Sequence, residues 1–202
     1  IKADGSFSST VQLKSFGDYE IGVKAKNKSG GEARRIAHVQ YSPQVKDIAD
    51  QANYKKTIAG LVALGYFSVD TKGNFDPEKN VTRAEWARML VKAKGLQPEK
   101  LSFTDVPANS AYAGSIGAAV KAGYLLPVKD GVFQPRGEVS RARAGMGLVQ
   151  AEGVDVAQYA GQPSFTDVPV GEAYAKYLSA GRSAGMFKGV SFKPMNSLTR
   201  LS

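Results

Sequence analysis

The sequence predicts a mainly α-helical protein built from three tandem repeats, preceded by a short segment of β-strands. Two observations carry this prediction. Residues 1–44 alternate apolar and polar side chains with a period of two, which is typical of half-buried strands. Residues 45–202 contain the same landmarks three times in the same order, with the motif arginine recurring after 58 and then 59 residues. Apolar side chains within each repeat follow helical spacing.

The β-segment contains three candidate strands. The first covers residues 7–13, the second covers 19–25 after a turn at Gly17-Asp18, and the third covers 33–41 after a turn at 27–31. The stretches ADGSFSSTVQL, GDYEIGVKAKNKSG and RRIAHVQY resemble the closing strands of a bacterial immunoglobulin-like domain. Three strands are too few for a stable sandwich. We therefore expect the missing strands upstream of residue 1, and the chain to be an internal piece of a longer protein.

A loop and a helix open each repeat. Phe-Thr-Asp-Val-Pro stands at residues 103–107 and 165–169, and residues 45–48 (Val-Lys-Asp-Ile) are a weaker copy. We interpret the aspartates of these loops as turn or cap residues rather than ligands; they are Asp47, Asp105 and Asp167. A tyrosine then begins each helical pattern and a glycine ends it, as in helices that stop at a left-handed residue. These pairs are Tyr54 and Gly65, Tyr112 and Gly123, and Tyr174 and Gly185.

A second loop and helix close each repeat. A Gly-x-Phe-x-Pro loop lies at residues 73–77 and 131–135, and a copy with one extra residue lies at 189–194. We expect its phenylalanine to be buried and its proline to stiffen the loop. The motif after the loop reads VTRAE at 81–85, VSRAR at 139–143 and LTRLS at 198–202. It marks the start of a second helix in each repeat.

The second helices differ between the first two repeats. Thr82 and Glu85 match a capping box, in which each side chain accepts a hydrogen bond from the other residue's backbone N–H. Trp86 follows on the apolar face, where core packing and stacking on a sugar ring are the two readings. The second repeat has Arg143 in place of the glutamate and carries interior glycines at 145 and 147. Each interior glycine costs about 1 kcal/mol relative to alanine, so we expect tertiary packing to hold that helix.

The combination of FTDVP, the Gly-x-Phe-x-Pro loop and the TRAE-type motif resembles the S-layer homology family over residues 45–202. The resemblance implies a pseudo-threefold helical assembly with grooves between neighbouring repeats. We expect the first repeat at 45–102, the second at 103–162 and a truncated third at 163–202. The resemblance also implies an extracellular location in the cell wall or S-layer. There the module would attach an S-layer protein or exoenzyme non-covalently to an anionic, often pyruvylated, secondary cell-wall polysaccharide or another peptidoglycan-linked glycan.

The same resemblance implies which residues contact the glycan. The motif arginine is the residue most associated with binding, and a guanidinium can hold a carboxylate through two parallel hydrogen bonds. Its place in the first turn of a helix also predicts free backbone N–H groups beside the anion. Internal salt bridges are the alternative role for the arginines, and helix capping is the alternative for the hydroxyls. Carried over residue by residue, the predicted site is Arg83, Arg141, Arg200, Thr82, Ser140, Thr199 and Glu85.

Composition narrows the function further. The net charge of +9 favours an anionic partner, but the charge is dispersed and lacks interleaved aromatic residues, so nucleic acid is not expected. No apolar run reaches the roughly 18 residues of a transmembrane helix. The chain has no cysteine, which excludes cysteine-based metal, redox and nucleophile chemistry. Known catalytic motifs are absent and His38 has no partner residue nearby in the sequence, so we expect a non-enzymatic module without a cofactor.

A structural role is the alternative from a different class. In that role the repeats hold a lattice or filament together through protein–protein contacts, including self-association into a surface layer, and have little affinity for glycan. Binding to cell-wall sacculi with and without the acidic polysaccharide separates the two functions.

Overall fold

The computed structural model describes residues 6–11, 17–41, 45–49, 51–162 and 164–201. The chain divides into two compact units, Ile1–Asp76 and Pro77–Ser202, so the division falls inside the first predicted repeat. The described residues form five α-helices, one 3-10 helix and one two-stranded sheet, in agreement with a mainly helical chain. None of these helices is long and apolar enough to cross a membrane.

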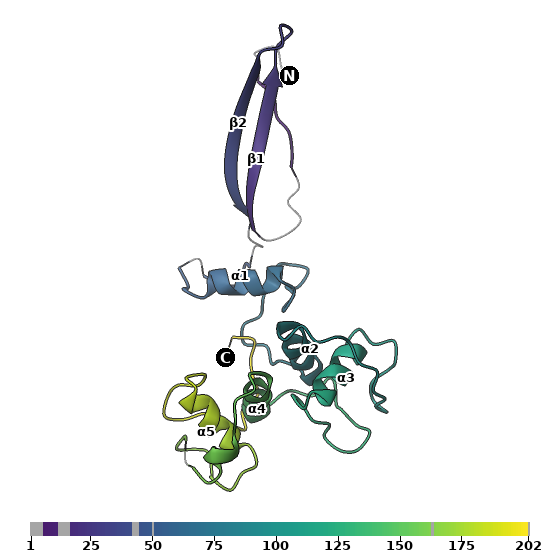
Figure 1. Ribbon diagram of the computed structural model, residues 1–202, viewed down its shortest axis with the longest axis vertical. Coiled ribbons are helices and arrows are strands. Elements are labelled where there is room, and N and C mark those ends of the chain that lie inside the picture. Colours follow the sequence, from purple (N-terminus) through teal and green to yellow (C-terminus); the bar gives the residue numbers. More distant parts are fainter. Residues whose placement is uncertain (1–5, 12–16, 42–44, 50, 163, 202) are drawn as a thin grey trace. The chain divides into compact units, whose positions relative to one another are not determined.

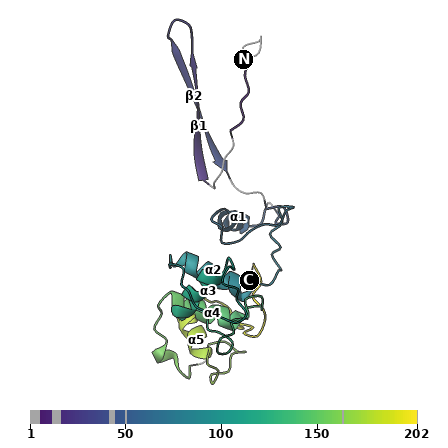
Figure 2. The same ribbon diagram turned by 90° about the vertical axis from the view of Figure 1, so that its right-hand side faces the viewer.

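The β-segment is a hairpin. Strand β1 (Gly17–Lys26) pairs antiparallel with β2 (Glu32–Tyr41), as Figures 1 and 2 show. The turn between them is held by Asn27, whose side-chain oxygen accepts hydrogen bonds from the N–H groups of Ser29 and Gly31. The second and third predicted strands and the turn that joins them are therefore confirmed.

Two details of the β-segment differ from the prediction. The turn expected at Gly17-Asp18 is wrong, because these residues pair with Tyr41 and Gln40 inside the hairpin. Residues 7–11 of the first predicted strand are not in a strand, and the rest of it lies outside the described residues. An isolated two-stranded hairpin is marginally stable in water, and here Val23 and Ile36 are 39% and 45% exposed. The immunoglobulin-like sandwich stays a prediction.

The first unit also holds the opening half of the first repeat. Helix α1 (Lys55–Ala63) begins after Tyr54, and Gly65 follows its end with a left-handed φ of 71°. The two buried residues of α1 belong to a small apolar core that includes the phenylalanine of the Gly-x-Phe-x-Pro loop. That core consists of Val45, Ile48, Ile58, Ala59 and Phe75.

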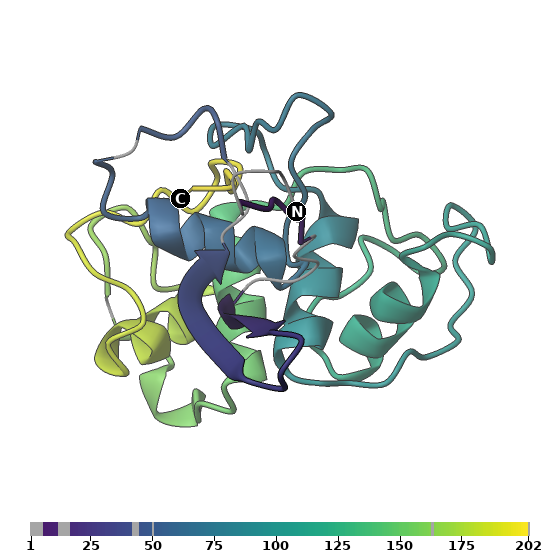
Figure 3. The same ribbon diagram turned by 90° about the horizontal axis from the view of Figure 1, so that it is seen from above.

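The second unit alternates opening and closing helices. The closing helices are α2 (Arg83–Ala93) and α4 (Arg141–Ala151), and the opening helices are α3 (Ala113–Lys121) and α5 (Ala175–Ser183). A 3-10 helix, η1 (Ala157–Tyr159), lies between α4 and α5. Helix α2 packs against α3, and α4 packs against α5 (Figures 1 and 3). The closing helix of one repeat thus packs against the opening helix of the next.

Backbone hydrogen bonds join the three motif segments in a closed ring. The N–H of Val139 donates to the carbonyl of Val81 at 3.0 Å, Leu198 donates to Val139 at 2.9 Å, and Val81 donates to Leu198 at 2.8 Å. The third motif departs most from the others in sequence, yet it makes the same kind of bond. All three motifs therefore share this backbone bond, although a helix follows only the first two among the described residues.

The loops of other repeats bind the start of each motif. Each motif arginine donates its backbone N–H to the loop of another repeat: Arg83 to Gly137, Arg141 to Asn196 and Arg200 to Lys79, at 2.8, 2.8 and 3.0 Å. The residue after each arginine donates to the proline carbonyl of the same loop: Ala84 to Pro135, Ala142 to Pro194 and Leu201 to Pro77. The first turn of each motif is thereby tied to the loop beside it.

The interior glycines of α4 have a packing reason. A Cβ on Gly147 would lie 2.4 Å from the carbonyl oxygen of Tyr124, and a Cβ on Gly145 would lie 2.9 Å from a methyl group of Leu178. Both distances are shorter than van der Waals contact, so alanine would force these neighbours apart. The close approach confirms that tertiary packing holds this helix.

Candidate functional site: the groove between α2 and the second-repeat loop

Each opening aspartate anchors the Gly-x-Phe-x-Pro loop of its own repeat. The carboxylate accepts hydrogen bonds from the N–H of the loop phenylalanine and of the residue after it, at 2.7–2.9 Å. The donors are Phe75 and Asp76 for Asp47, Phe133 and Gln134 for Asp105, and Phe192 and Lys193 for Asp167. The interpretation of these aspartates as turn residues is confirmed, including Asp47 in the weak first copy.

The anchored loops have an unusual backbone. The residue after each phenylalanine is left-handed although it is not glycine: φ is 54° at Asp76, 58° at Gln134 and 57° at Lys193. Such residues are uncommon and persist where the surroundings determine them strongly. Here the aspartate holds the N–H of that residue, and the preceding phenylalanine is at most 6% exposed in each repeat. The loops are therefore fixed platforms for the residues that follow.

The aspartates stay ionised at neutral pH. The hydroxyl of Ser191 and the N–H of Phe192 lower the pKa of Asp167 to about 2. Burial raises the pKa of Asp105, but the hydrogen bonds from Phe133 and Gln134 outweigh it and the pKa is lowered. Each carboxylate thus carries its charge while its oxygens are occupied by backbone N–H groups.

The motif arginine of the first repeat is an internal strut. Arg83 is 2% exposed, and its Nε and Nη2 donate to the carbonyls of Phe133 and Leu126 at 2.8 and 2.7 Å. Its guanidinium carbon lies 4.7 Å from the centre of the Phe133 ring. Burial lowers its pKa to about 10, with the positive charge of Arg143 acting in the same direction, so the group remains protonated at neutral pH. The buried side chain of Arg83 therefore links the first motif to the second repeat through the carbonyls of Phe133 and Leu126.

Arg141 repeats this arrangement in the next repeat. Its Nε donates to the carbonyl of Phe192 at 2.9 Å, and its guanidinium carbon lies 5.2 Å from that ring. Ser140 caps α4 by accepting from the N–H of Arg143 at 3.3 Å. In the third motif, Thr199 pairs with Asn80 in an isolated bridge and the backbone of Arg200 is bonded to Lys79.

The expected free N–H groups at the start of α2 are occupied, so that prediction is wrong. The N–H groups of Arg83 and Ala84 donate to loop carbonyls, and that of Glu85 donates to the Thr82 hydroxyl at 3.2 Å. The Glu85 carboxylate accepts in turn from the Thr82 N–H and hydroxyl at 2.8 and 2.9 Å. The predicted capping box is confirmed, and it uses donors that an anion would otherwise find at a helix start.

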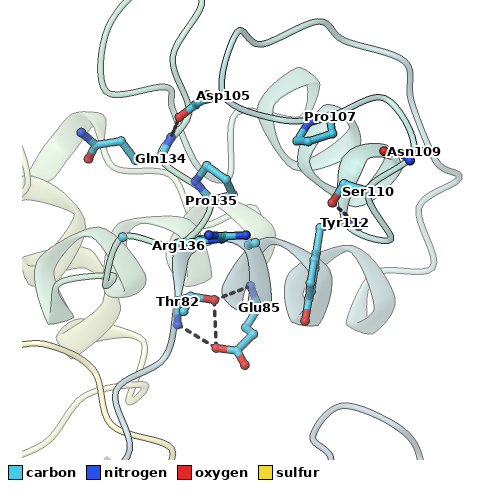
Figure 4. Close-up of a pocket in the computed structure, with 12 residues that line it drawn as sticks. Thr82, Glu85, Asp105, Pro107, Asn109, Ser110, Tyr112, Gln134, Pro135 and Arg136 are labelled. Atoms are coloured by element: carbon cyan, nitrogen blue, oxygen red, sulfur yellow. Dashed lines mark hydrogen bonds between the residues drawn. The ribbon is translucent and has the colours of Figure 1, made fainter.

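A cavity of about 790 Å³ lies above this capping box. Thr82 and Glu85 form one side, and Figure 4 shows the second-repeat loops opposite them. Tyr112 borders the cavity, and the guanidinium carbon of Arg88 lies 4.9 Å from the centre of its ring. The remaining lining is Ala84, Asp105, Pro107, Asn109, Ser110, Gln134, Pro135, Arg136 and Gly137. A tyrosine ring among amides, a hydroxyl and an arginine suits a sugar that carries a negative charge.

The cavity brings together only part of the predicted site. Thr82 and Glu85 line it, whereas Arg83 lies below its surface. Trp86 is partly buried and borders a different cavity of about 340 Å³, next to Arg141 and Phe187. The sequence analysis did not select Asn109, Gln134 or Arg136. Their one distinguishing feature in the sequence is that they follow the landmark residues Asp105 and Phe133 within four positions. Among the described residues, no group of three or more His, Cys, Asp or Glu side chains is placed to hold a metal ion.

Comparison with known proteins agrees with this architecture. The S-layer homology domain matches residues 46–87 and 102–142. These two stretches of the chain are thus similar to S-layer homology domains. Each matched stretch ends in or just after the motif that begins α2 or α4. The third repeat is not part of the match, although its motif forms the same backbone bonds.

Several bacterial proteins are similar to parts of this chain. The surface-layer 125 kDa protein of Lysinibacillus sphaericus is 31% identical over 160 residues, which is 78% of this chain and 13% of that protein. The surface layer protein of Brevibacillus choshinensis is 34% identical over 110 residues, 52% of this chain and 10% of that protein. An amylopullulanase of Thermoanaerobacterium thermosulfurigenes is 33% identical over 94 residues, 45% of this chain and 5% of that protein.

The chain therefore spans 13% or less of the length of these three relatives. Two of them are named as surface-layer proteins and one as an amylopullulanase. The S-layer homology match and the surface-layer relatives indicate a cell-wall-associated location at the cell surface.

Proposed function

We propose that this chain anchors a larger surface protein non-covalently to an anionic, pyruvylated secondary cell-wall polysaccharide. The cavity between α2 and the second-repeat loop carries the proposal, because it joins polar side chains, Tyr112 and a cation in a fixed frame. The net charge of +9 supports an acidic partner. The S-layer homology match supports a wall-associated role that is not enzymatic.

We further propose that the three repeats form a pseudo-threefold assembly. The ring of bonds among Val81, Val139 and Leu198 supports it, because each motif donates to one neighbour and accepts from the other. The matching loop bonds of Arg83, Arg141 and Arg200 support it in the same way. In this proposal each repeat interface forms one groove, and the hairpin is the end of an immunoglobulin-like domain.

The predicted site residues divide by role in this proposal. Thr82 and Glu85 border the first groove and orient each other through the capping box. Arg83 acts mainly by positioning the second-repeat loop, and Arg141 does the same for the third. At the other interfaces the hydroxyl residues that correspond to Thr82 are Ser140 and Thr199, and Arg200 is the counterpart of the positioning residues Arg83 and Arg141.

Sedimentation with purified sacculi tests the anchoring function. The chain is expected to co-sediment with intact sacculi and to stay in solution when the acidic polysaccharide has been stripped away. Tyr112→Ala removes the ring beside the cavity and is expected to weaken binding, whereas Tyr177→Ala, outside the cavity, is the matched control. Equal binding to stripped and intact sacculi would exclude the polysaccharide as the partner.

A structural subunit is the second candidate, and the hairpin favours it. Both strands present exposed apolar side chains, including Val23 and Ile36, and an exposed strand edge can pair with another chain. Sedimentation velocity across a concentration series separates the candidates. Growth into large assemblies in the absence of any glycan supports the lattice, and a monomer that binds sacculi supports the anchor.

A further inference from the structure

We infer that Arg136 recognises the acidic group of the glycan in the first groove, while the buried motif arginine Arg83 supports the loop beneath it. This inference rests on the proposed function, because it assigns the charge recognition of that same groove. Arg136 stands immediately after the proline of the Gly-x-Phe-x-Pro loop and outside every repeat landmark.

The charged side chains that line the cavity are Glu85, Asp105 and Arg136. One oxygen of Glu85 accepts both hydrogen bonds from Thr82, and the two oxygens of Asp105 accept from Phe133 and Gln134. These internal bonds hold both carboxylates in place and account for their presence. The Arg136 side chain has no hydrogen bond or ion pair with any described residue, and it is exposed. It is the charged group of the cavity that is left for a ligand.

Arg83 and the start of α2 are the other sources of positive charge beside the cavity. The guanidinium of Arg83 is buried: its Nε and Nη2 donate to the carbonyls of Phe133 and Leu126, and only its buried Nη1 has no hydrogen-bond partner among the described residues. The first N–H groups of α2 are bonded to Pro135, Gly137 and Thr82. The helix start is therefore closed to a carboxylate in the groove, and the Arg83 guanidinium is 2% exposed, although the sequence favoured both as contacts.

The backbone holds Arg136 in a defined place. The carbonyl of Pro135 accepts from Ala84 at 3.1 Å, and the carbonyl of Gly137 accepts from Arg83 at 2.8 Å. Both neighbours of Arg136 are thus bonded to α2, and the loop before them is anchored by Asp105. Figure 4 shows the Arg136 side chain between Pro135 and the Thr82–Glu85 pair. A long side chain that projects from a fixed backbone loses less freedom on binding than one on a mobile loop.

The surroundings of Arg136 define the ligand. Asn109, Ser110 and Gln134 are polar residues of the lining, and Tyr112 adds an aromatic ring. Amides and hydroxyls can bond sugar hydroxyls, and an aromatic ring can pack against the apolar face of a sugar. We therefore assign to this groove a hexose that bears a carboxylate, with the carboxylate on the guanidinium of Arg136.

The corresponding position in the third-repeat loop is Met195, which is 68% exposed and uncharged. In the second motif, Arg143 replaces the acidic Glu85. The first groove therefore has its cation, Arg136, on the loop, whereas the next interface has its cation, Arg143, in the motif. Recognition through a loop arginine is specific to the first groove.

Titration calorimetry with two probes tests the inference. The probes are a methyl hexopyranoside carrying a 4,6-linked pyruvyl ketal and the same sugar without the ketal. Arg136→Gln is expected to weaken binding of the pyruvylated sugar roughly ten- to hundredfold, the range expected when one charge-assisted contact is lost. Arg136→Lys should recover part of it because the charge remains. Lys129→Gln makes the same charge change at an exposed residue outside the cavity and should leave binding unchanged.

The outcomes separate the two proposals. If the unmodified chain binds the pyruvylated sugar no better than the neutral one, the acidic-glycan function itself fails. If the unmodified chain prefers the pyruvylated sugar but Arg136→Gln binds it equally well, only the assignment to Arg136 fails. Circular dichroism of each variant checks that the helices are retained.

Discussion

Replacing the buried motif arginine tests whether it is a strut. Arg83→Met keeps an apolar stem of similar length but removes the guanidinium. The change takes away two hydrogen bonds, at 2.8 and 2.7 Å, and the contact with the Phe133 ring. It also leaves the carbonyls of Phe133 and Leu126 without these donors. We expect the free energy of unfolding to fall because buried acceptors are left unsatisfied.

The magnitude follows from opposing contributions. Each unsatisfied carbonyl costs about 1–3 kcal/mol, and the lost cation–π contact costs about 1 kcal/mol. Removing a buried charge recovers part of this, since the desolvation of the guanidinium disappears. We expect a net loss of about 3 kcal/mol. With a urea dependence of about 1.5 kcal/mol per molar, the unfolding midpoint falls by roughly 2 M.

Urea unfolding followed by fluorescence measures this loss. The chain has one tryptophan, Trp86, which lies on α2 three residues after Arg83. Arg136→Met is the matched control, because it removes an exposed guanidinium from the loop beside Arg83 and should change stability by less than about 0.5 kcal/mol. Equal midpoints for Arg83→Met and the unmodified chain would refute the strut role and return Arg83 to the groove surface.

Three further changes test the frame of the site. Gly147→Ala should lower the free energy of unfolding by about 1–3 kcal/mol, because its Cβ would meet the Tyr124 carbonyl. Gly60→Ala in α1 has open space around the new Cβ and should raise that free energy by up to about 1 kcal/mol. If urea unfolding shows changes of the same sign for both variants, the packing explanation is contradicted. Thr82→Ala should cost about 1 kcal/mol through the lost cap, and an unchanged thermal midpoint would argue against it. The pKa of Asp167 is lowered to about 2 from 3.8, so its stabilisation is present above pH 4 and is lost as pH falls toward 2. In Asp167→Asn the free energy of unfolding should fall less steeply as the pH drops from about 4 toward 2. An unchanged pH dependence would contradict the stabilising role of the Asp167 carboxylate.

Local signals explain why much of the fold was predictable. The tyrosine and glycine that bound α1, α3 and α5, and the capping box of Thr82 and Glu85, depend on residues a few positions apart. Burial of Phe75, Phe133 and Phe192 follows from their place in a repeated loop. The turn at Gly17-Asp18 failed because a glycine suggests a turn locally, while pairing with a strand more than twenty residues away decides the outcome.

The candidate site was less predictable because its contacts are distant in sequence. The guanidinium of Arg83 bonds to residues 43 and 50 positions away, and these bonds turn an expected ligand contact into an internal strut. The N–H groups at the start of α2 are likewise used by a loop more than fifty residues away. Arg136 could not be singled out from the sequence. It differs from other exposed arginines only because the neighbouring charged side chains, Glu85 and Asp105, already accept internal hydrogen bonds.

Repetition in the amino-acid order was enough to predict helices α1 to α5 and the buried loop phenylalanines, because each depends on spacing within one repeat. Only the tertiary structure decided how the motifs and loops of different repeats bond to one another. Asp47 in the weak first copy anchors its loop as Asp105 and Asp167 do, and the divergent third motif closes the ring with Val81 and Val139. Backbone N–H and carbonyl groups make these bonds, and they form wherever the chain brings them together, whatever side chains the residues carry.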